Sequence, residues 1–189
     1  GFVNTHTHIS MSILRGIGDD LPLDTWLNEC IWPLEANLTE EICYTGALLS
    51  CIEMIKTGTT CLNDMYFNMG NVADAIKDSG MRGVLGYCII AFDEETKQKE
   101  IKITNKFVEQ YHNTADGRVT TAISPHAPYT TTPDVLKWVR SKSTKLGMPI
   151  HIHVSETKKE IEDIVELYGM RPFEYLEDLE FLGSDIIDL

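Results

Sequence analysis

The chain has 189 residues, of which 43% are hydrophobic and 24% charged, as is usual for a globular domain with its own core. Sixteen basic and 29 acidic side chains give a net charge of −13, which repels a phosphate backbone and excludes nucleic acid as a partner. No apolar run approaches the ~20 residues of a membrane span, and the N-terminus lacks a signal-peptide pattern, so we expect a cytoplasmic protein without a membrane partner.

The five cysteines do not form a Cys-x-x-Cys pair, and their number is odd. These features argue against a disulfide framework and against a thiolate zinc site. We interpret the cysteines as small, buried hydrophobic side chains.

The first predicted strand, residues 2–8, carries His6 and His8. Residues i and i+2 of a strand face the same side, so the two imidazoles can share one metal ion. The alternative is a pair of solvated histidines near a chain end.

A polar loop is predicted at residues 9–20, followed by a short helix at residues 22–31 with Asp24 as its cap. A longer helix begins after Thr39, which caps it, and ends at Gly58. Its apolar face is expected from Ile42, Leu49, Ile52 and Ile55.

Strands and helices alternate along the rest of the chain. Further strands are expected at residues 59–63, 83–90, 119–124, 149–155 and 185–189. Helices are expected at residues 72–79, 93–113, 132–146, 161–168 and 172–180. Such alternation predicts a parallel α/β sheet.

Two architectures fit this alternation, the open doubly wound sheet and the eight-stranded barrel. The turn after the first strand lacks the Gly-x-Gly-x-x-Gly pattern of dinucleotide-binding sheets. Chemically competent side chains follow several different strands, as in the active sites of barrels, so we favour the barrel. Six strands cannot close it, and we therefore expect a part of a longer protein.

Polar residues at the strand ends suggest a metal site. His6, His8 and His153 would supply three ligands of a catalytic zinc site with one position open for water, and imidazole suits iron as well. Glu156 follows His153 closely, so we assign it proton transfer. Its alternative role is a carboxylate at the first turn of the next helix.

Two other histidines need separate interpretations. His151 shares a strand face with His153 but lies one layer deeper, so we interpret it as a hydrogen-bonded filler of the barrel interior. His126 lies between two prolines at a strand end, where it either faces a substrate or packs the loop.

Five motifs together resemble the amidohydrolase superfamily, and within it the 5-methylthioadenosine/S-adenosylhomocysteine deaminases, including the 5'-deoxyadenosine deaminases. The motifs are GFVNTHTH (residues 1–8), WPLEA (32–36), GTT (58–60), SPHAPY (124–129) and HVSET (153–157).

This resemblance implies a (β/α)8 TIM-type barrel hydrolase with one divalent metal ion, usually Zn2+ and alternatively Fe2+. The reaction implied is the replacement of the 6-amino group of a 5'-modified adenosine by oxygen, with release of ammonia. Residues 1–189 would form the first five β/α units and the start of the sixth strand of the barrel domain. Outside this sequence would lie the companion β-sandwich, the last barrel units, an aspartate ligand and a catalytic histidine. Full activity is therefore expected only of the intact protein. The intact protein could form a homo-oligomer.

The family's functional residues can be matched one by one. His6, His8 and His153 match the metal ligands. Glu156 matches the acid that moves a proton from water to the purine, and His126 matches a substrate-contacting histidine. Glu35 matches the carboxylate that binds the ribose, and an ionised carboxylate can accept hydrogen bonds from two vicinal hydroxyls.

Other functions remain as alternatives. The same site could act on guanine or an s-triazine, because one activated water can serve several aromatic rings. The chain could also be a non-catalytic relative that kept the barrel. Tyr87 stands where some relatives carry an arginine, which disfavours charged 5'-substituents.

Overall fold

A parallel sheet of six strands, in the order β1-β2-β3-β4-β5-β6, forms the centre of the computed structural model, which describes residues 1–188. The strands are β1 (Phe2–Thr7), β2 (Thr59–Tyr66), β3 (Arg82–Ile89), β4 (Val119–Pro125), β5 (Ile150–Ile152) and β6 (Ile186–Asp188). The predicted alternation of strand and helix is confirmed.

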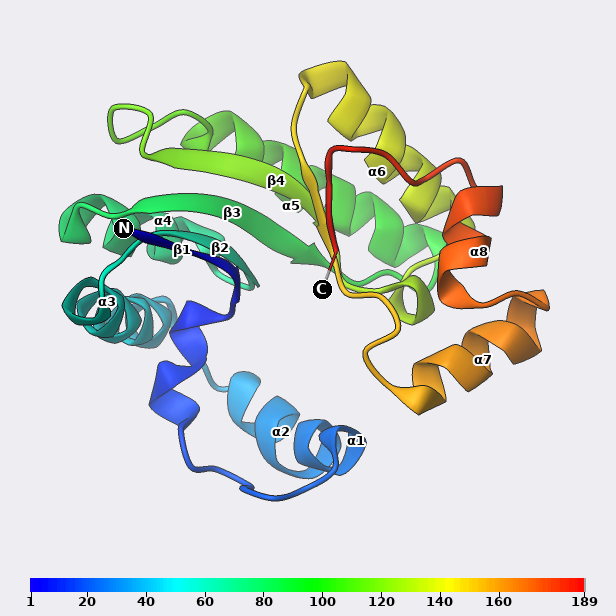
Figure 1. Cartoon of the computed structure of the whole chain (residues 1–189), viewed down its shortest axis with the longest axis horizontal. Coiled ribbons are helices and arrows are strands. Elements are labelled where there is room, and N and C mark those ends of the chain that lie inside the picture. The colour runs from blue at the N-terminus through cyan, green and yellow to red at the C-terminus, as the bar shows by residue number, and fades with distance from the viewer. Residues whose placement is uncertain (189) are drawn as a thin grey trace.

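The strand order distinguishes between the two predicted architectures. In an open doubly wound sheet the order reverses at a switch point, and helices cover both faces. Here each strand pairs with the next one in the chain, and the connecting helices lie outside a curved sheet (Figure 1). This is the arrangement of a TIM-type barrel, of which the chain forms a part.

Six longer helices follow the strands. They are α3 (Glu40–Thr57), α4 (Met69–Ser79), α5 (Glu94–Tyr111), α6 (Pro133–Leu146), α7 (Lys158–Tyr168) and α8 (Pro172–Asp178). The Thr39 hydroxyl accepts a hydrogen bond from the backbone N–H of Ile42 at 3.3 Å, which confirms the predicted cap of α3. Gly58 ends this helix with a left-handed φ of 89°.

The buried face of α3 differs from the prediction. The aliphatic residues expected there are 38–53% exposed: Ile42, Leu49, Ile52 and Ile55. The helix instead packs through small side chains, including the fully buried Cys43, Ala47 and Cys51. At Gly46 an added Cβ would lie 2.3 Å from the carbonyl oxygen of Ser10, so the helix approaches the preceding segment too closely for larger residues.

The segment between β1 and α3 is more helical and less regular than predicted. Its elements are η1 (Ile9–Leu14), α1 (Leu23–Thr25), η2 (Trp26–Ile31) and α2 (Trp32–Glu35). The polar loop expected at residues 9–20 was therefore wrong in its first half. The Asp24 cap was also wrong, because Pro22 occupies the cap position and Asp24 accepts hydrogen bonds from the Asn28 amide instead.

Two strand ends differ from the prediction in ways that matter for the site. β2 continues past residue 63 to Tyr66, and β5 stops at Ile152, so that His153 lies just beyond the strand. In the predicted sixth strand, Ile186–Asp188 is confirmed, and Leu189 lies outside the described residues.

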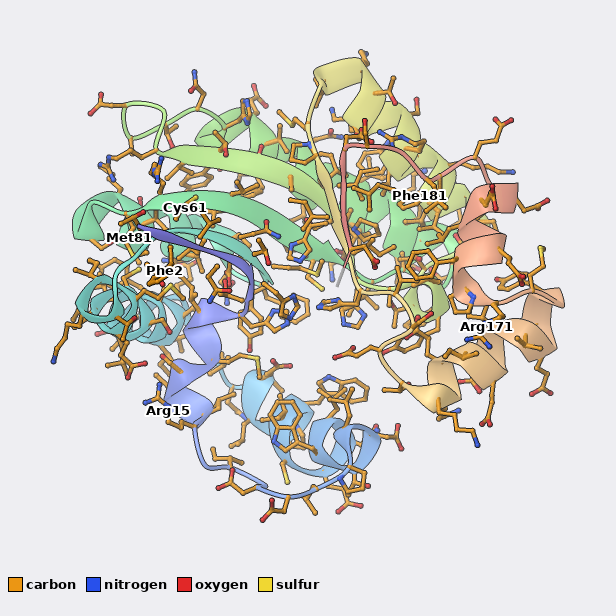
Figure 2. All side chains as sticks on the ribbon, viewed as in Figure 1. Phe2, Arg15, Cys61, Met81, Arg171 and Phe181 are labelled. Atoms are coloured by element: carbon orange, nitrogen blue, oxygen red, sulfur yellow. The ribbon has the colours of Figure 1, made fainter. Side chains whose placement is uncertain are left out.

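Apolar side chains fill the space between the sheet and its helices. Ile123, Leu136, Ile150 and Phe181 are completely buried in one cluster, and the labelled Phe181 lies between α6 and α8 (Figure 2). Burying each such side chain contributes about 1.5–3 kcal/mol. Polar residues lie outside this core, at the carboxyl ends of the strands.

The cysteines are free, as predicted. Cys43, Cys51 and Cys88 are buried, whereas Cys30 and Cys61 are only partly so. Among the described residues, no helix has the length and hydrophobicity required to cross a bilayer.

Candidate active site

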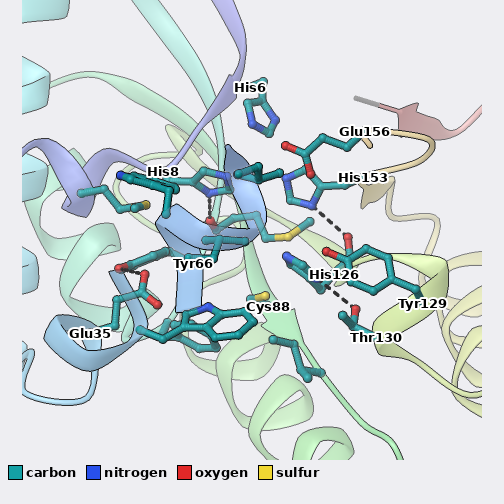
Figure 3. Close-up of a pocket in the computed structure, with 18 of the residues that line it drawn as sticks. His6, His8, Glu35, Tyr66, Cys88, His126, Tyr129, Thr130, His153 and Glu156 are labelled. Atoms are coloured by element: carbon teal, nitrogen blue, oxygen red, sulfur yellow. Dashed lines mark hydrogen bonds between the residues drawn. The ribbon is translucent and has the colours of Figure 1, made fainter. Parts of the chain in front are cut away.

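Three histidines meet where β1 and β5 end. The ligating atoms of His6, His8 and His153 all lie within 4.8 Å of one another. The His6 ring centroid is 4.9 Å from that of His8 and 5.1 Å from that of His153. His6 and His8 thus face the same point as predicted, although β1 ends at Thr7 and His8 lies one residue beyond it, and His153 approaches the pair from the other side (Figure 3).

Hydrogen bonds fix which ring nitrogen is available on two of these histidines. Nδ1 of His8 lies 2.5 Å from the Met65 carbonyl oxygen, and Nδ1 of His153 lies 2.9 Å from that of His126. A carbonyl only accepts hydrogen bonds, so each Nδ1 must carry a proton, and in the neutral form of each ring Nε2 keeps a free lone pair. Metal-ligating histidines are oriented in this way.

The remaining features of the cluster also fit a metal ion. Nδ1 of His6 is buried and has no hydrogen-bond partner among the described residues, and such an atom needs compensation. Burial, followed by the neighbouring histidines, lowers the pKa of His6 to about 4. Burial also lowers the pKa of His153 to about 4. Both imidazoles are therefore neutral near pH 7, the form that binds metal.

A buried carboxylate holds the end of β1. Asp64 on β2 is fully buried and accepts hydrogen bonds from the Thr7 hydroxyl at 2.8 Å and from the backbone N–H of Ile9 at 2.7 Å. These two residues flank His8. Burial raises the pKa of Asp64, and both hydrogen bonds oppose that shift.

Glu156 lies beside this cluster, on the loop between β5 and α7. Its side chain is close to His6 and His153 (Figure 3), and its charge acts to raise the pKa of His6 against the larger effect of burial. The alternative role at the start of α7 is not realised, because Thr157 is the cap and Glu160 is the acid of the first turn.

The histidines and Glu156 form one end of a cavity of about 400 Å³. Known small-molecule sites have volumes of roughly 300–1,000 Å³. Most of the remaining wall is apolar, with contributions from Met11, Trp26, Leu27, Trp32, Phe67 and Phe92. Such a wall suits a flat, largely apolar ligand with a few polar groups.

Glu35 lines the same cavity, at the end of α2. The Tyr66 hydroxyl donates a hydrogen bond to its carboxylate (Figure 3). Burial, followed by the hydrogen bond to Glu35, raises the pKa of Tyr66, so the phenol remains a donor over the physiological range. One carboxylate oxygen is thereby held in place.

Comparisons with known proteins identify the family of this chain. The profile of the Amidohydrolase family matches residues 1–187. The chain belongs to the amidohydrolase family. It is 53% identical over 188 residues, 99% of its length, to a protein of Methanobrevibacter smithii named 5'-deoxyadenosine deaminase. The chain spans 43% of that relative, less than half.

Two solved structures have the same architecture as this chain. An adenosine deaminase from Xanthomonas campestris, crystallised with bound zinc, is 37% identical and superimposes with a TM-score of 0.92 over 100% of this chain and 43% of its own. The atrazine chlorohydrolase TrzN of Arthrobacter aurescens, solved with zinc, is 17% identical with a TM-score of 0.87 over 100% of this chain and 48% of its own. The second likeness shows the fold alone.

In this amidohydrolase chain, His126 both packs its loop and lines the cavity. Its Nδ1 lies 2.9 Å from the Thr130 hydroxyl, and its backbone carbonyl orients His153. Burial, followed by His153 and His8, lowers the pKa of His126 to about 3. The two interpretations from the sequence are therefore compatible.

His151 lies in the deeper layer, as predicted, and is 0% exposed. The hydrogen bonds expected for it were wrong, because neither ring nitrogen has a partner among the described residues. Its ring centroid is 5.9 Å from that of His6, and it is not one of the three clustered histidines.

Two residues of the site escaped the sequence analysis, Asp64 and Tyr66. Both lie in the part of β2 that the predicted strand at residues 59–63 left out. An aspartate followed by large side chains directly after an apolar strand was the signal that could have identified them.

Proposed function

We propose that the full-length protein catalyses hydrolytic deamination of 5'-modified adenosines, such as 5'-deoxyadenosine, 5-methylthioadenosine, S-adenosylhomocysteine and adenosine. The products are the inosine analogue and ammonia. One observation carries the proposal: a cavity with three clustered histidines and Glu156 at one end also contains a carboxylate, Glu35, held by Tyr66. The similarity of this chain to the 5'-deoxyadenosine deaminase of M. smithii and to the adenosine deaminase of X. campestris supports it.

His6, His8 and His153 hold one divalent metal ion in this proposal, with Zn2+ preferred over Fe2+. The available Nε2 atoms of His8 and His153 and the low pKa values of His6 and His153 support this role, as does the zinc in the X. campestris structure. When bound, the ion supplies activation of water at neutral pH. These histidines bind it from two strands that are separated by most of the chain.

Glu156 transfers the proton. It takes a proton from the attacking water and delivers it to a ring nitrogen of the purine while the water oxygen bonds to C6. The second proton of the water then passes to the amino group, the C6–N bond breaks, ammonia leaves, and C6 becomes a carbonyl. His126, which lines the cavity next to His153, contacts the substrate. Its low pKa supports a neutral imidazole that can accept or donate a hydrogen bond there.

Glu35 binds the ribose. An ionised carboxylate can accept hydrogen bonds from two vicinal hydroxyls, and Tyr66 restrains its orientation. The apolar wall of the cavity receives the adenine ring and the 5'-substituent.

The proposal also covers parts of the protein outside this sequence. The last barrel units would add an aspartate ligand and a catalytic histidine, and a β-sandwich would accompany the barrel. We place the intact enzyme in the cytoplasm, acting on small nucleosides and not on nucleic acid or membranes.

Ammonia release tests the proposal on the full-length, metal-loaded protein. The substrates are 5'-deoxyadenosine, 5-methylthioadenosine, S-adenosylhomocysteine, adenosine, guanine and an amino-substituted s-triazine, whose hydrolysis would also release ammonia. We expect turnover of adenosines and none of guanine or the triazine. Glu35→Gln should weaken nucleoside binding, whereas Glu29→Gln, at an exposed acid of the same segment, should not. Absence of bound metal, or a preference for guanine or the triazine, would overturn the assignment.

A further inference from the structure

Glu160 is a buried acid that the proposed reaction does not use. It lies in the first turn of α7 and is 2% exposed. Among residues 1–188, no basic side chain forms an ion pair with it. A carboxylate in such a place must be stabilised by hydrogen bonds and by the helix N-terminus.

Part of this stabilisation is an ordinary helix cap. The Thr157 hydroxyl accepts a hydrogen bond from the backbone N–H of Glu160 at 3.1 Å, as in the Thr-x-x-Glu capping box. In a simple capping box, the glutamate carboxylate returns to the N–H of the cap residue itself. Such a cap would serve only the stability of α7.

The Glu160 carboxylate reaches further upstream than a simple cap requires. One oxygen accepts the backbone N–H of Ser155 at 2.9 Å, and the other accepts that of Glu156 at 2.8 Å. The two oxygens therefore hold two successive peptide groups. The second of these groups carries the side chain that lies beside His6 and His153.

The loop needs such a restraint. Ser155 has a φ of 62°, in the left-handed region that residues other than glycine rarely adopt. This conformation persists only where the surroundings determine it. Without the two hydrogen bonds, the backbone of the loop could relax and carry the Glu156 carboxylate away from the histidines.

We propose that Glu160 is a positioning residue, which fixes the backbone of Glu156 so that its carboxylate stays beside the three histidines. This inference rests on the proposed deaminase function, and Glu160 itself contacts no substrate. Burial raises the pKa of Glu160, and the hydrogen bonds from the N–H groups of the loop oppose that shift.

The chain offers a matched control in the next helix. The carboxylate of Glu174 accepts the backbone N–H of Arg171 at 2.8 Å, which forms an exposed capping box at the start of α8, away from the cavity. Glu174→Gln therefore weakens a helix cap without touching the site.

The experiment compares Glu160→Gln and Glu174→Gln in the full-length, metal-loaded enzyme. Both variants should lower Tm, because each weakens a helix cap. Only Glu160→Gln should lower kcat, by about 10- to 100-fold, the cost of a small misplacement of a catalytic group. KM and bound metal should stay unchanged. A kcat equal to that of Glu174→Gln would overturn the inference.

Two further variants separate the possible failures. Glu156→Gln tests the proposed function itself, because a normal rate there would overturn both. If Glu156→Gln is inactive while Glu160→Gln is normal, only the positioning role is lost. Should Glu160→Gln not fold, Glu160→Asp keeps the charge but shortens the reach, and we expect a lower kcat with unchanged KM and metal. An unchanged kcat in that variant would overturn the positioning role.

Discussion

The two ends of the cavity are built in different ways. At the histidine end, His8 and His153 extend from strand ends, and their rings are held by backbone carbonyls. At the other end, Glu35 lies on a segment of short, irregular helices, its carboxylate is held by the Tyr66 hydroxyl, and the nearby Trp32 is 51% exposed. The rigid scaffold thus carries the proposed chemistry, and the connecting segment carries the proposed recognition.

The largest effect should come from the histidine end. His153→Ala removes one of three clustered ligands, so we expect loss of bound metal and of all measurable deamination. Metal analysis and ammonia release would check this. His112→Ala is the control, because His112 is exposed and hydrogen-bonds to Thr121. Full metal content in the His153 variant would contradict the proposed ligand set.

Removing the carboxylate at the recognition end should affect binding more than chemistry. A hydrogen bond to a charged group is worth about 1.5–3 kcal/mol, so Glu35→Ala should raise KM for adenosines by about 10- to 100-fold. We expect kcat to change much less. Steady-state kinetics would check this. A large loss of kcat at unchanged KM would show that Glu35 acts in the reaction and not in substrate binding.

A smaller effect is expected from the residue that restrains Glu35. Tyr66→Phe deletes the donor to the carboxylate, so KM should rise by about 5- to 10-fold, which corresponds to about 1 kcal/mol. Tyr44→Phe is the matched control, because Tyr44 donates to the Asp78 carboxylate at 2.8 Å outside the cavity. Equal KM values in the two variants would show that Glu35 does not need this restraint.

The smallest effect concerns the scaffold far from the cavity. Arg140 pairs with Asp185 and lowers the pKa of this carboxyl. The stabilisation is therefore present above the usual Asp pKa of about 3.9 and is lost as pH falls through the lower folded-state pKa. Asp185 is 40% exposed, so Arg140→Gln should cost only about 0.5–1 kcal/mol at neutral pH.

Urea unfolding at neutral pH and below about pH 3 would check this sign. The difference between Arg140→Gln and the parent should shrink in acid. A difference that grows in acid would contradict the assigned direction, and a change in KM would contradict the separation of scaffold and site.

The contrast between the two ends also explains what could be read from the sequence. His6 and His8 were predictable because strand geometry repeats every two residues. The role of Glu35 was predicted only from the resemblance to the family. In a segment of short helices, no periodicity of the sequence indicates which side chains face the cavity. The face of α3 was misjudged because close packing at Gly46 selects small residues over aliphatic ones.

One further interpretation has lost its basis. Tyr87 is not among the residues that line the cavity, and burial, followed by the Glu100 charge, raises its pKa. It therefore gives no guide to the 5'-substituent. The strand that carries Tyr87, β3, was predicted to within one residue at each end. Whether the Tyr87 side chain faces the cavity depends on how the sheet curves.

Ammonia release from 5'-deoxyadenosine, measured for the full-length protein and for Glu156→Gln at equal metal content, shows whether the protein is a deaminase that uses Glu156 for proton transfer. We expect release by the parent enzyme and a rate about 10²- to 10⁴-fold lower in the variant, the usual contribution of a positioned acid–base group. Equal rates for the two proteins, with equal metal bound, would contradict it.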